Sequence, residues 1–204
     1  MISTLIFILL MIISYFLGCF STAKLFVKSY KSMNIYKVGT GHPDTENIFH
    51  NIGKTLGIFT GIVDFGKIFF YLIILSLLLN YPEITDLIGE NIGTENHLLA
   101  LGFIMVVGHC LPITSHFRGG RGIFTYIGFM TFFAPWPMMI ILLLALLIVV
   151  FYKQIRFAQY IIVLLPPFIN FFFERDPGLL GKLFIAAILM GIMNIFVSKK
   201  LGEI

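Results

Sequence analysis

The chain turns at His116-Phe117-Arg118-Gly119-Gly120-Arg121-Gly122, a short basic, glycine-rich stretch that separates two long apolar runs. Its glycines expose backbone N–H groups, a helix can begin directly after it, and its two arginines carry planar cationic side chains. All three features favour binding of a phosphate group. A turn that only fixes the orientation of a membrane protein would show the same basic residues, and this alternative stays open. We predict that Arg118, Gly119, Gly120 and Arg121 bind phosphate.

On both sides of this turn, the composition is that of a membrane protein. Hydrophobic residues make up 58% of the 204 residues, charged residues only 12%, and the mean hydropathy is +0.97. A soluble domain of this length would need more polar surface. The net charge of +4 does not indicate nucleic-acid binding, because the basic residues stand at the ends of apolar runs. We expect an all-α integral membrane protein with one domain, residues 1–204, in the inner cell membrane and without a nucleic-acid partner.

About seven transmembrane helices are expected from the apolar runs. They are residues 2–20, 56–79, 97–112, 123–134, 137–152, 157–173 and 179–197. A helix rises about 1.5 Å per residue and must cross about 30 Å of hydrocarbon, so the run 2–20 is long enough to be the first span. The run 123–134 is short, which predicts either a short span completed by its neighbours or a re-entrant element.

The lysines and arginines provide an independent test of this count. If the first span runs into the cytoplasm, the fourteen basic residues divide as eleven on the cytoplasmic side, two outside and Lys67 within a span. The eleven are Lys24, Lys28, Lys31, Lys37, Lys54, Arg118, Arg121, Lys153, Arg156, Lys199 and Lys200. This asymmetry predicts an external N-terminus and a cytoplasmic C-terminus. The polar loop after the first span and the basic turn then face the same compartment, and we expect them to form one site at the cytoplasmic surface.

The loop from Val38 to Asn47 is unusually rich in functional groups. It reads Val-Gly-Thr-Gly-His-Pro-Asp-Thr-Glu-Asn, which places hydroxyl, imidazole, carboxylate and amide groups close together. Such density at a membrane surface suggests binding of a polar substrate, although a solvated loop explains this stretch equally well. His42 is a candidate for acid–base catalysis by its chemistry alone.

Three ionisable residues within apolar runs are candidates for a site. Asp64 and Lys67 are spaced i, i+3 and share a helix face. An ionisable group within hydrocarbon costs at least about 2.5 kcal/mol, so these two either pair with each other or support a site. His109, near a span boundary, is either a packed polar residue or a second acid–base candidate. No Cys or His cluster has a metal-binding spacing, and we expect neither a metal nor a cofactor.

Four segments stand in order within residues 10–130. They read Gly18-Cys-Phe-Ser-Thr22-Ala23, Val38-Gly-Thr-Gly-His-Pro-Asp-Thr-Glu-Asn47, Asp64-Phe-Gly-Lys67 and Gly108-His-Cys-Leu-Pro-Ile-Thr-Ser-His-Phe-Arg-Gly-Gly-Arg-Gly122. Together they resemble the bacterial acyl-phosphate:glycerol-3-phosphate acyltransferases, the PlsY family of membrane enzymes with seven spans. The resemblance implies transfer of a fatty acyl group from acyl phosphate to glycerol 3-phosphate, without an acyl-enzyme, to give lysophosphatidic acid.

The resemblance also implies roles for individual residues. Arg118, Arg121 and the Gly119-Gly120 backbone would hold phosphate, and Asp64 with Lys67 would support the site. The acceptor would be positioned by Thr40, Gly41, Asn47 and His50. The implied partners are acyl phosphate, glycerol 3-phosphate or another polar acceptor, and membrane lipid.

Several positions depart from the family pattern. Serine, asparagine, glycine, threonine and arginine of the family are replaced here by Thr40, His42, Asp44, Glu46 and His50. The added acids and the lost arginine weaken support for a doubly charged phosphate. The family's C-terminal His-Arg-x-Asn segment has no counterpart in this sequence. Two alternatives therefore stay open: a related paralogue with another acceptor or no catalysis, and a membrane transport or binding protein for a phosphorylated metabolite.

Overall fold

The computed structural model describes residues 2–88, 93–173 and 176–200, and this part of the chain is helical without any strand. The first half contains α1 (Ile2–Cys19), α2 (Thr22–Lys31), the short 3₁₀ turn η1 (Ile35–Lys37), α3 (Thr45–Asn51), α4 (Lys54–Leu79), α5 (Pro82–Ile88) and α6 (Glu95–Cys110). The second half contains the 3₁₀ turn η2 (Ile113–Ser115), α7 (Ile123–Phe133), α8 (Pro135–Leu147), the π-helical turn η3 (Ile148–Tyr152), α9 (Ile155–Leu164), α10 (Pro166–Phe173) and α11 (Pro177–Lys200).

All seven apolar runs are helical, which confirms the expected helical membrane fold. Five helical stretches in the described residues are long and apolar enough to cross a membrane. They are Ser3–Lys31, Lys54–Leu79, Glu95–Ser115, Pro135–Tyr152 and Pro177–Lys199. A sixth crossing results if α9 and α10, which meet at a 44° bend before Pro166, form one broken span.

The remaining apolar run, 123–134, forms α7, which has only 11 residues. Most of its side chains are buried, including Tyr126, Phe129 and Met130. A helix surrounded by protein need not reach both membrane surfaces, because neighbouring helices, rather than lipid, cover its ends. The environment of α7 therefore explains how this element can be shorter than the hydrocarbon layer.

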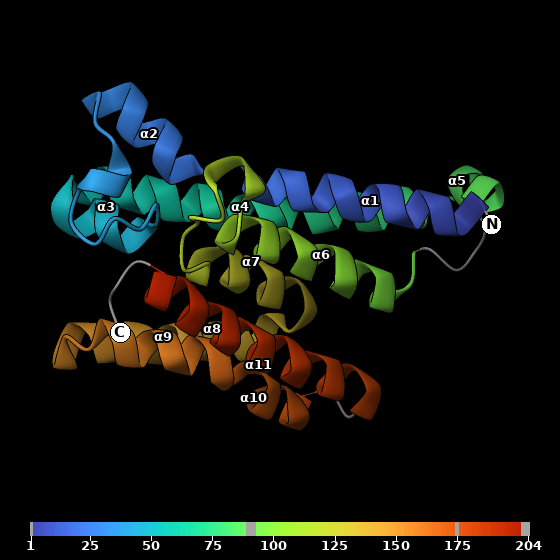
Figure 1. Cartoon of the computed structure of the whole chain (residues 1–204). Coiled ribbons are helices and arrows are strands. Elements are labelled where there is room, and N and C mark those ends of the chain that lie inside the picture. The colour runs from blue at the N-terminus through green and yellow to red at the C-terminus, as the bar shows by residue number, and fades with distance from the viewer. Residues whose placement is uncertain (1, 89–92, 174–175, 201–204) are drawn as a thin grey trace.

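The elements that carry the polar segments gather at one end of the bundle. Figure 1 shows α1 beginning beside α5 at the opposite end, whereas α2, α3 and the end of α11 lie at this end. We call residues 22–51 and 111–122 the loop end. Within it, the Tyr36 hydroxyl donates to the Arg118 carbonyl at 3.0 Å, and Lys24 Nζ donates to Ser115 Oγ at 2.8 Å. The polar loop and the basic turn thus lie in contact, as the charge distribution predicts.

Close packing between α1 and α6 holds this arrangement. A Cβ atom on Gly18 would collide with the Met105 carbonyl, and one on Gly108 would collide with the Tyr15 carbonyl. The two helices therefore approach each other with backbone against backbone, as small residues allow in membranes. This contact fixes the end of α6, and with it His109, close to the start of α2.

Candidate functional site

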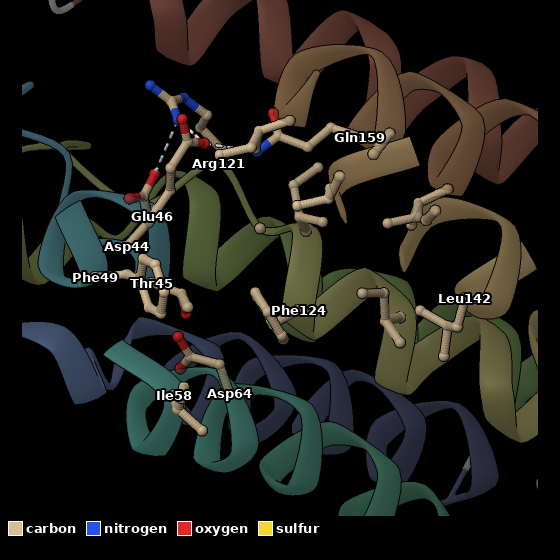
Figure 2. Close-up of a pocket in the computed structure, with 18 of the residues that line it drawn as sticks. Asp44, Thr45, Glu46, Phe49, Ile58, Asp64, Arg121, Phe124, Leu142 and Gln159 are labelled. Atoms are coloured by element: carbon tan, nitrogen blue, oxygen red, sulfur yellow. Dashed lines mark hydrogen bonds and ion pairs between the residues drawn. The ribbon is translucent and has the colours of Figure 1, made fainter. Parts of the chain in front are cut away.

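A cavity of about 500 Å³ lies below the loop end, between α4, α7, α8 and α9. Its wall is mainly apolar, and the residues include Ile58 and Ile62 of α4, Phe124 and Ile127 of α7, Leu142 and Ala145 of α8, and Ala158 and Ile162 of α9. Its polar lining comes from the loop end and the adjacent helices: Asp44, Thr45, Glu46, His50, Asp64, His109, Arg121 and Gln159. Figure 2 shows ten of the lining residues by name, with Glu46 and Arg121 on one side and Leu142 on the other. The cavity therefore joins a polar end to a hydrocarbon-lined wall.

Asp44 and Glu46 at the start of α3 lie beside the Arg121 guanidinium, and Gln159 of α9 contacts Glu46; we call these four residues the Arg121 cluster (Figure 2). Arg121 Nη1 donates to Glu46 Oε2 at 2.6 Å and lies 3.7 Å from Asp44 Oδ2. Gln159 Nε2 donates to the same Glu46 oxygen at 2.6 Å. The Arg121 side chain is only 1% exposed, whereas that of Glu46 is 23% exposed. Glu46 therefore links α3 both to the basic turn and to α9.

Asp44 begins α3 and has a second role there. Its Oδ1 accepts a hydrogen bond from the backbone N–H of Asn47 at 2.9 Å, which caps the helix. Burial raises the pKa of the Asp44 carboxyl, although nearby Arg121 and the bond from Asn47 act in the opposite direction. Asp44 is thus a buried carboxyl with a greater tendency to hold a proton than an exposed one.

A second group of polar residues lies where α2, α4 and α6 meet, and we call Thr22, Asp64, Lys67 and His109 the Asp64 cluster. The Thr22 hydroxyl donates to Asp64 Oδ1 at 2.9 Å. Lys67 Nζ lies 3.0 Å from Asp64 Oδ1, 2.8 Å from His109 Nδ1 and 3.2 Å from the carbonyl of Phe20. An ammonium group has three N–H donors and no acceptor, so these three partners match its full capacity.

This geometry assigns a tautomer to His109 when Lys67 is charged. Lysine then donates to Nδ1, which must be the acceptor nitrogen of a neutral imidazole. The ring proton therefore resides on Nε2, on the side of Gly120. His109 lines the cavity, and its Nε2–H is a donor that Lys67 and Asp64 orient.

The basic turn packs tightly between these two clusters. A Cβ atom on Gly120 would lie 2.9 Å from His109 Nε2 and 3.0 Å from the Pro43 carbonyl. Gly122 has φ of 76°, in the left-handed region that favours glycine, and it precedes α7. Glycine at these positions allows the turn to bring Arg121 against α3 while contacting the end of α6.

The structure brings some of the expected site residues to the cavity. Arg121, His50, Asp64 and His109 line it, and Lys67 supports both Asp64 and His109. Among the described residues, its lining omits Thr40, Gly41, His42, Asn47, Arg118, Gly119 and Gly120. Arg118 is exposed at the loop end, so the two arginines of the turn occupy different environments.

The Asn47 side chain, predicted to position the acceptor, makes its hydrogen bonds to residues 38–51. Its Nδ2 donates to the carbonyls of Val38 and His42, both at 2.9 Å. Its Oδ1 accepts from the Thr40 backbone at 3.1 Å and from Asn51 Nδ2 at 3.0 Å. The amide of Asn47 is thus engaged in shaping the loop, and its contribution to the cavity is through the position of α3.

Sequence reasoning missed three polar residues that the structure places at the site. Thr22 donates to Asp64, Gln159 donates to Glu46, and Asn194 Nδ2 donates to the Arg121 carbonyl at 3.2 Å. Gln159 and Asn194 are amides within apolar runs, which is a usable signal because polar groups in membrane helices usually face a partner. Thr22 stands in the first of the four segments that carry the family resemblance, Gly18 to Ala23, and this was the usable signal for that residue.

The fold and site define an integral membrane protein whose helical bundle encloses a cavity with an arginine-containing polar end. Residues 8–201 match the family model described as "Glycerol-3-phosphate acyltransferase". The chain therefore belongs to this family. The family match extends well beyond residues 10–130, to which the polar motifs had limited the resemblance, and includes the last helix.

Curated relatives carry the same description. The chain is 32% identical over 123 residues to "Glycerol-3-phosphate acyltransferase" of Mycoplasma mycoides, a match that covers 60% of this chain and 45% of the relative. It is 27% identical over 189 residues to that of Finegoldia magna, covering 93% and 87%, respectively. The match to the mycoplasma relative thus spans less than half of that protein's length.

Solved structures agree with the fold. The crystal structure of PlsY (YgiH), an integral membrane glycerol 3-phosphate acyltransferase, in its glycerol 3-phosphate form has a TM-score of 0.75 with 21% identity. The match covers 95% of this chain and 88% of the solved chain. Its lysophosphatidic acid form has a TM-score of 0.73 with 20% identity over the same coverage.

Proposed function

We propose that this chain transfers a fatty acyl group from acyl phosphate to glycerol 3-phosphate, which yields lysophosphatidic acid for phospholipid synthesis. One observation carries the proposal: a single cavity joins the polar end containing Arg121 to a long apolar wall. An acyl phosphate has the same division, with an anionic head and a hydrocarbon tail. Membership of the glycerol-3-phosphate acyltransferase family supports this reaction over transport.

The apolar wall is proposed to hold the acyl chain. It is formed by side chains of four helices, and small residues Ala145 and Ala158 leave space between α8 and α9. Hydrophobic walls with a few polar groups at one end are typical of sites for amphipathic ligands. The chain would lie along this wall with its reactive carbonyl at the polar end.

The polar end is proposed to stabilise the transfer step. The acceptor hydroxyl oxygen attacks the acyl carbonyl carbon, an ester C–O bond forms, and the bond from that carbon to the phosphate oxygen breaks. The hydroxyl proton leaves with the phosphate, so no side chain must gain or lose a proton overall. Arg121 would bind the phosphate of glycerol 3-phosphate, and His109 Nε2–H would donate to the acyl carbonyl oxygen, which becomes more negative.

The remaining expected residues take supporting parts in this proposal. Asp64 and Lys67 would position His109, and the exposed Arg118 would attract anionic substrates toward the loop end. His50 would contact the acceptor at the cavity, while Thr40, Gly41 and Asn47 would act through the shape of the loop. His42 stays an acid–base candidate by its chemistry; it is buried within the same loop and does not line the cavity.

We place the site on the cytoplasmic face of the inner membrane, with the N-terminus outside and the C-terminus inside. The concentration of Lys and Arg at the loop end supports this orientation. The opposite arrangement would leave most of these basic residues on the external side.

The test is to incubate the purified full chain with palmitoyl phosphate and glycerol 3-phosphate and to measure lysophosphatidic acid by mass spectrometry. Product from the wild type is expected. Ala145→Phe, which fills the apolar wall, should shift the preferred donor to shorter acyl chains, by roughly tenfold in relative kcat/KM. Leu143→Phe is the matched control, because Leu143 is 61% exposed on the same helix. Absence of product beside an active family member would contradict the proposed reaction.

A further inference from the structure

Glu46 holds the guanidinium that the proposed function assigns to phosphate. Its Oε2 accepts from Arg121 Nη1 and from Gln159 Nε2, both at 2.6 Å. Within the ion pair, the carboxylate is the more accessible member, since the Glu46 side chain is 23% exposed and that of Arg121 is 1% exposed. A ligand entering the cavity therefore meets a cation whose nearest anionic partner is already present.

The charges around the cavity leave no surplus of positive charge for that ligand. Among the described lining residues, Arg121 is the only lysine or arginine. Asp64 is matched by Lys67 at 3.0 Å, so this pair contributes little net charge. Glu46 alone is enough to neutralise Arg121, and Asp44 lies only 3.7 Å from the same nitrogen. Burial raises the pKa of the Asp44 carboxyl, so this group is less readily ionised than an exposed one. Even with Asp44 protonated, Glu46 still balances the charge of Arg121.

A phosphate monoester carries about −1.5 to −2 charges at neutral pH and binds arginine best through two parallel hydrogen bonds. Such a group is repelled by Glu46 unless the carboxylate gives up its contact with Arg121. An uncharged hydroxyl compound experiences no comparable repulsion. Glu46 is therefore positioned to discriminate between acceptors by their charge.

We propose that Glu46 is a specificity-determining residue that competes with the acceptor phosphate for Arg121 and weakens binding of phosphorylated acceptors relative to uncharged ones. This inference rests on the proposed acyl transfer. When a phosphate takes the place of Glu46 on Arg121, the link from α3 to Gln159 of α9 opens as well. Acceptor binding at the polar end thereby becomes coupled to a helix that forms the apolar wall.

The experiment compares wild type with Glu46→Gln, which removes the charge and retains an amide oxygen that can accept from Gln159. Rates of acyl transfer from palmitoyl phosphate are measured against the concentration of glycerol 3-phosphate and, separately, of glycerol. The KM for glycerol 3-phosphate should fall about tenfold in the variant, as expected for removal of one partly screened repulsion. The KM for glycerol should change less than twofold. Glu83→Gln on α5, at the opposite end of the bundle, is the control for a simple change in net charge.

Calorimetric titration with glycerol 3-phosphate, without donor, provides a readout independent of turnover. Tighter binding by Glu46→Gln supports the inference, even if the wild type makes no product and the proposed function fails. Active wild type with an unchanged or raised KM in the variant overturns the inference alone, because a carboxylate that merely supports Arg121 would not oppose phosphate. An equal fall of KM for both acceptors also overturns it. Inactive wild type together with equal binding overturns both proposals.

Discussion

The Asp64 cluster and the Arg121 cluster contain similar chemical groups but differ in how completely those groups are matched. In the Asp64 cluster, Lys67 has three acceptors for its three donors, and the Asp64 side chain is 3% exposed. In the Arg121 cluster, two carboxylates lie near one guanidinium, and Glu46 retains 23% exposure. A matched and buried cluster is suited to hold a geometry, whereas an acidic and partly open one is suited to exchange a partner for a ligand.

The position of each cluster reinforces this difference. The Asp64 cluster connects α2, α4 and α6, whose contacts are between regular helices. The Arg121 cluster connects α3, a turn and α9, and two of these belong to or adjoin loops. Helices in contact restrict motion more strongly than loop residues do, so ligand exchange is expected at the Arg121 cluster.

The largest expected effect follows from removing the ion pair of the Asp64 cluster. Asp64→Asn leaves the Lys67 charge without its anionic partner, which should destabilise the protein by about 3–5 kcal/mol. The measurement is thermal unfolding of the purified protein in detergent. The double variant Asp64→Asn with Lys67→Met should recover part of the loss, because the isolated charge is gone. Asp176→Asn, an exposed position at the start of α11, is the control.

A single variant as stable as wild type, or a double variant less stable than the single one, would show that the charges in this cluster do not depend on each other. The Asp64 cluster would then not be the supporting cluster that we propose.

An intermediate effect is expected at the Arg121 cluster. Arg121→Lys keeps the positive charge but loses the planar fork, so kcat/KM for glycerol 3-phosphate should fall by roughly 10²-fold. The loss of thermal stability should be smaller than for Asp64→Asn. Steady-state kinetics and unfolding are measured on the same preparation, with Arg156→Lys as the control. Unchanged kinetics combined with a larger loss of stability would reverse the roles assigned to the two clusters.

The smallest effect concerns Asp44 and pH. Because burial raises its pKa in the folded protein, the folded state binds a proton more readily than the unfolded chain does. The resulting stabilisation is present below the unfolded pKa, about 4, and is lost as the pH rises through the folded pKa. Asp44→Asn retains the helix cap and should therefore be more stable than wild type at pH 7, by a few degrees at most, with the difference vanishing toward pH 4. Melting curves between pH 4 and 7 test this, and a difference that grows on acidification would give the pKa shift the opposite sign.

The sequence predicted the helical membrane fold and the gathering of polar loops at one end, because hydropathy and basic residues can be read from each segment separately. It also singled out Asp64, His109 and Arg121, which line the cavity in the structure. Phosphate binding by Arg118 and Arg121 stays a prediction: Arg121 lines the cavity, whereas Arg118, three residues earlier in the turn, is exposed. Thr40 and Asn47 likewise belong to the framework of the loop.

What the sequence determined by itself was the set of apolar segments, their approximate limits and the presence of ionisable residues that need partners in or near hydrocarbon. Only the tertiary structure decided which partners they have: Glu46 and Gln159 at Arg121, and His109 with the Phe20 carbonyl at Lys67. The physical reason is that transfer into a bilayer depends mainly on the composition of each segment. Hydrogen bonds and ion pairs instead depend on distances of about 3 Å between elements far apart in the chain, which helix packing sets.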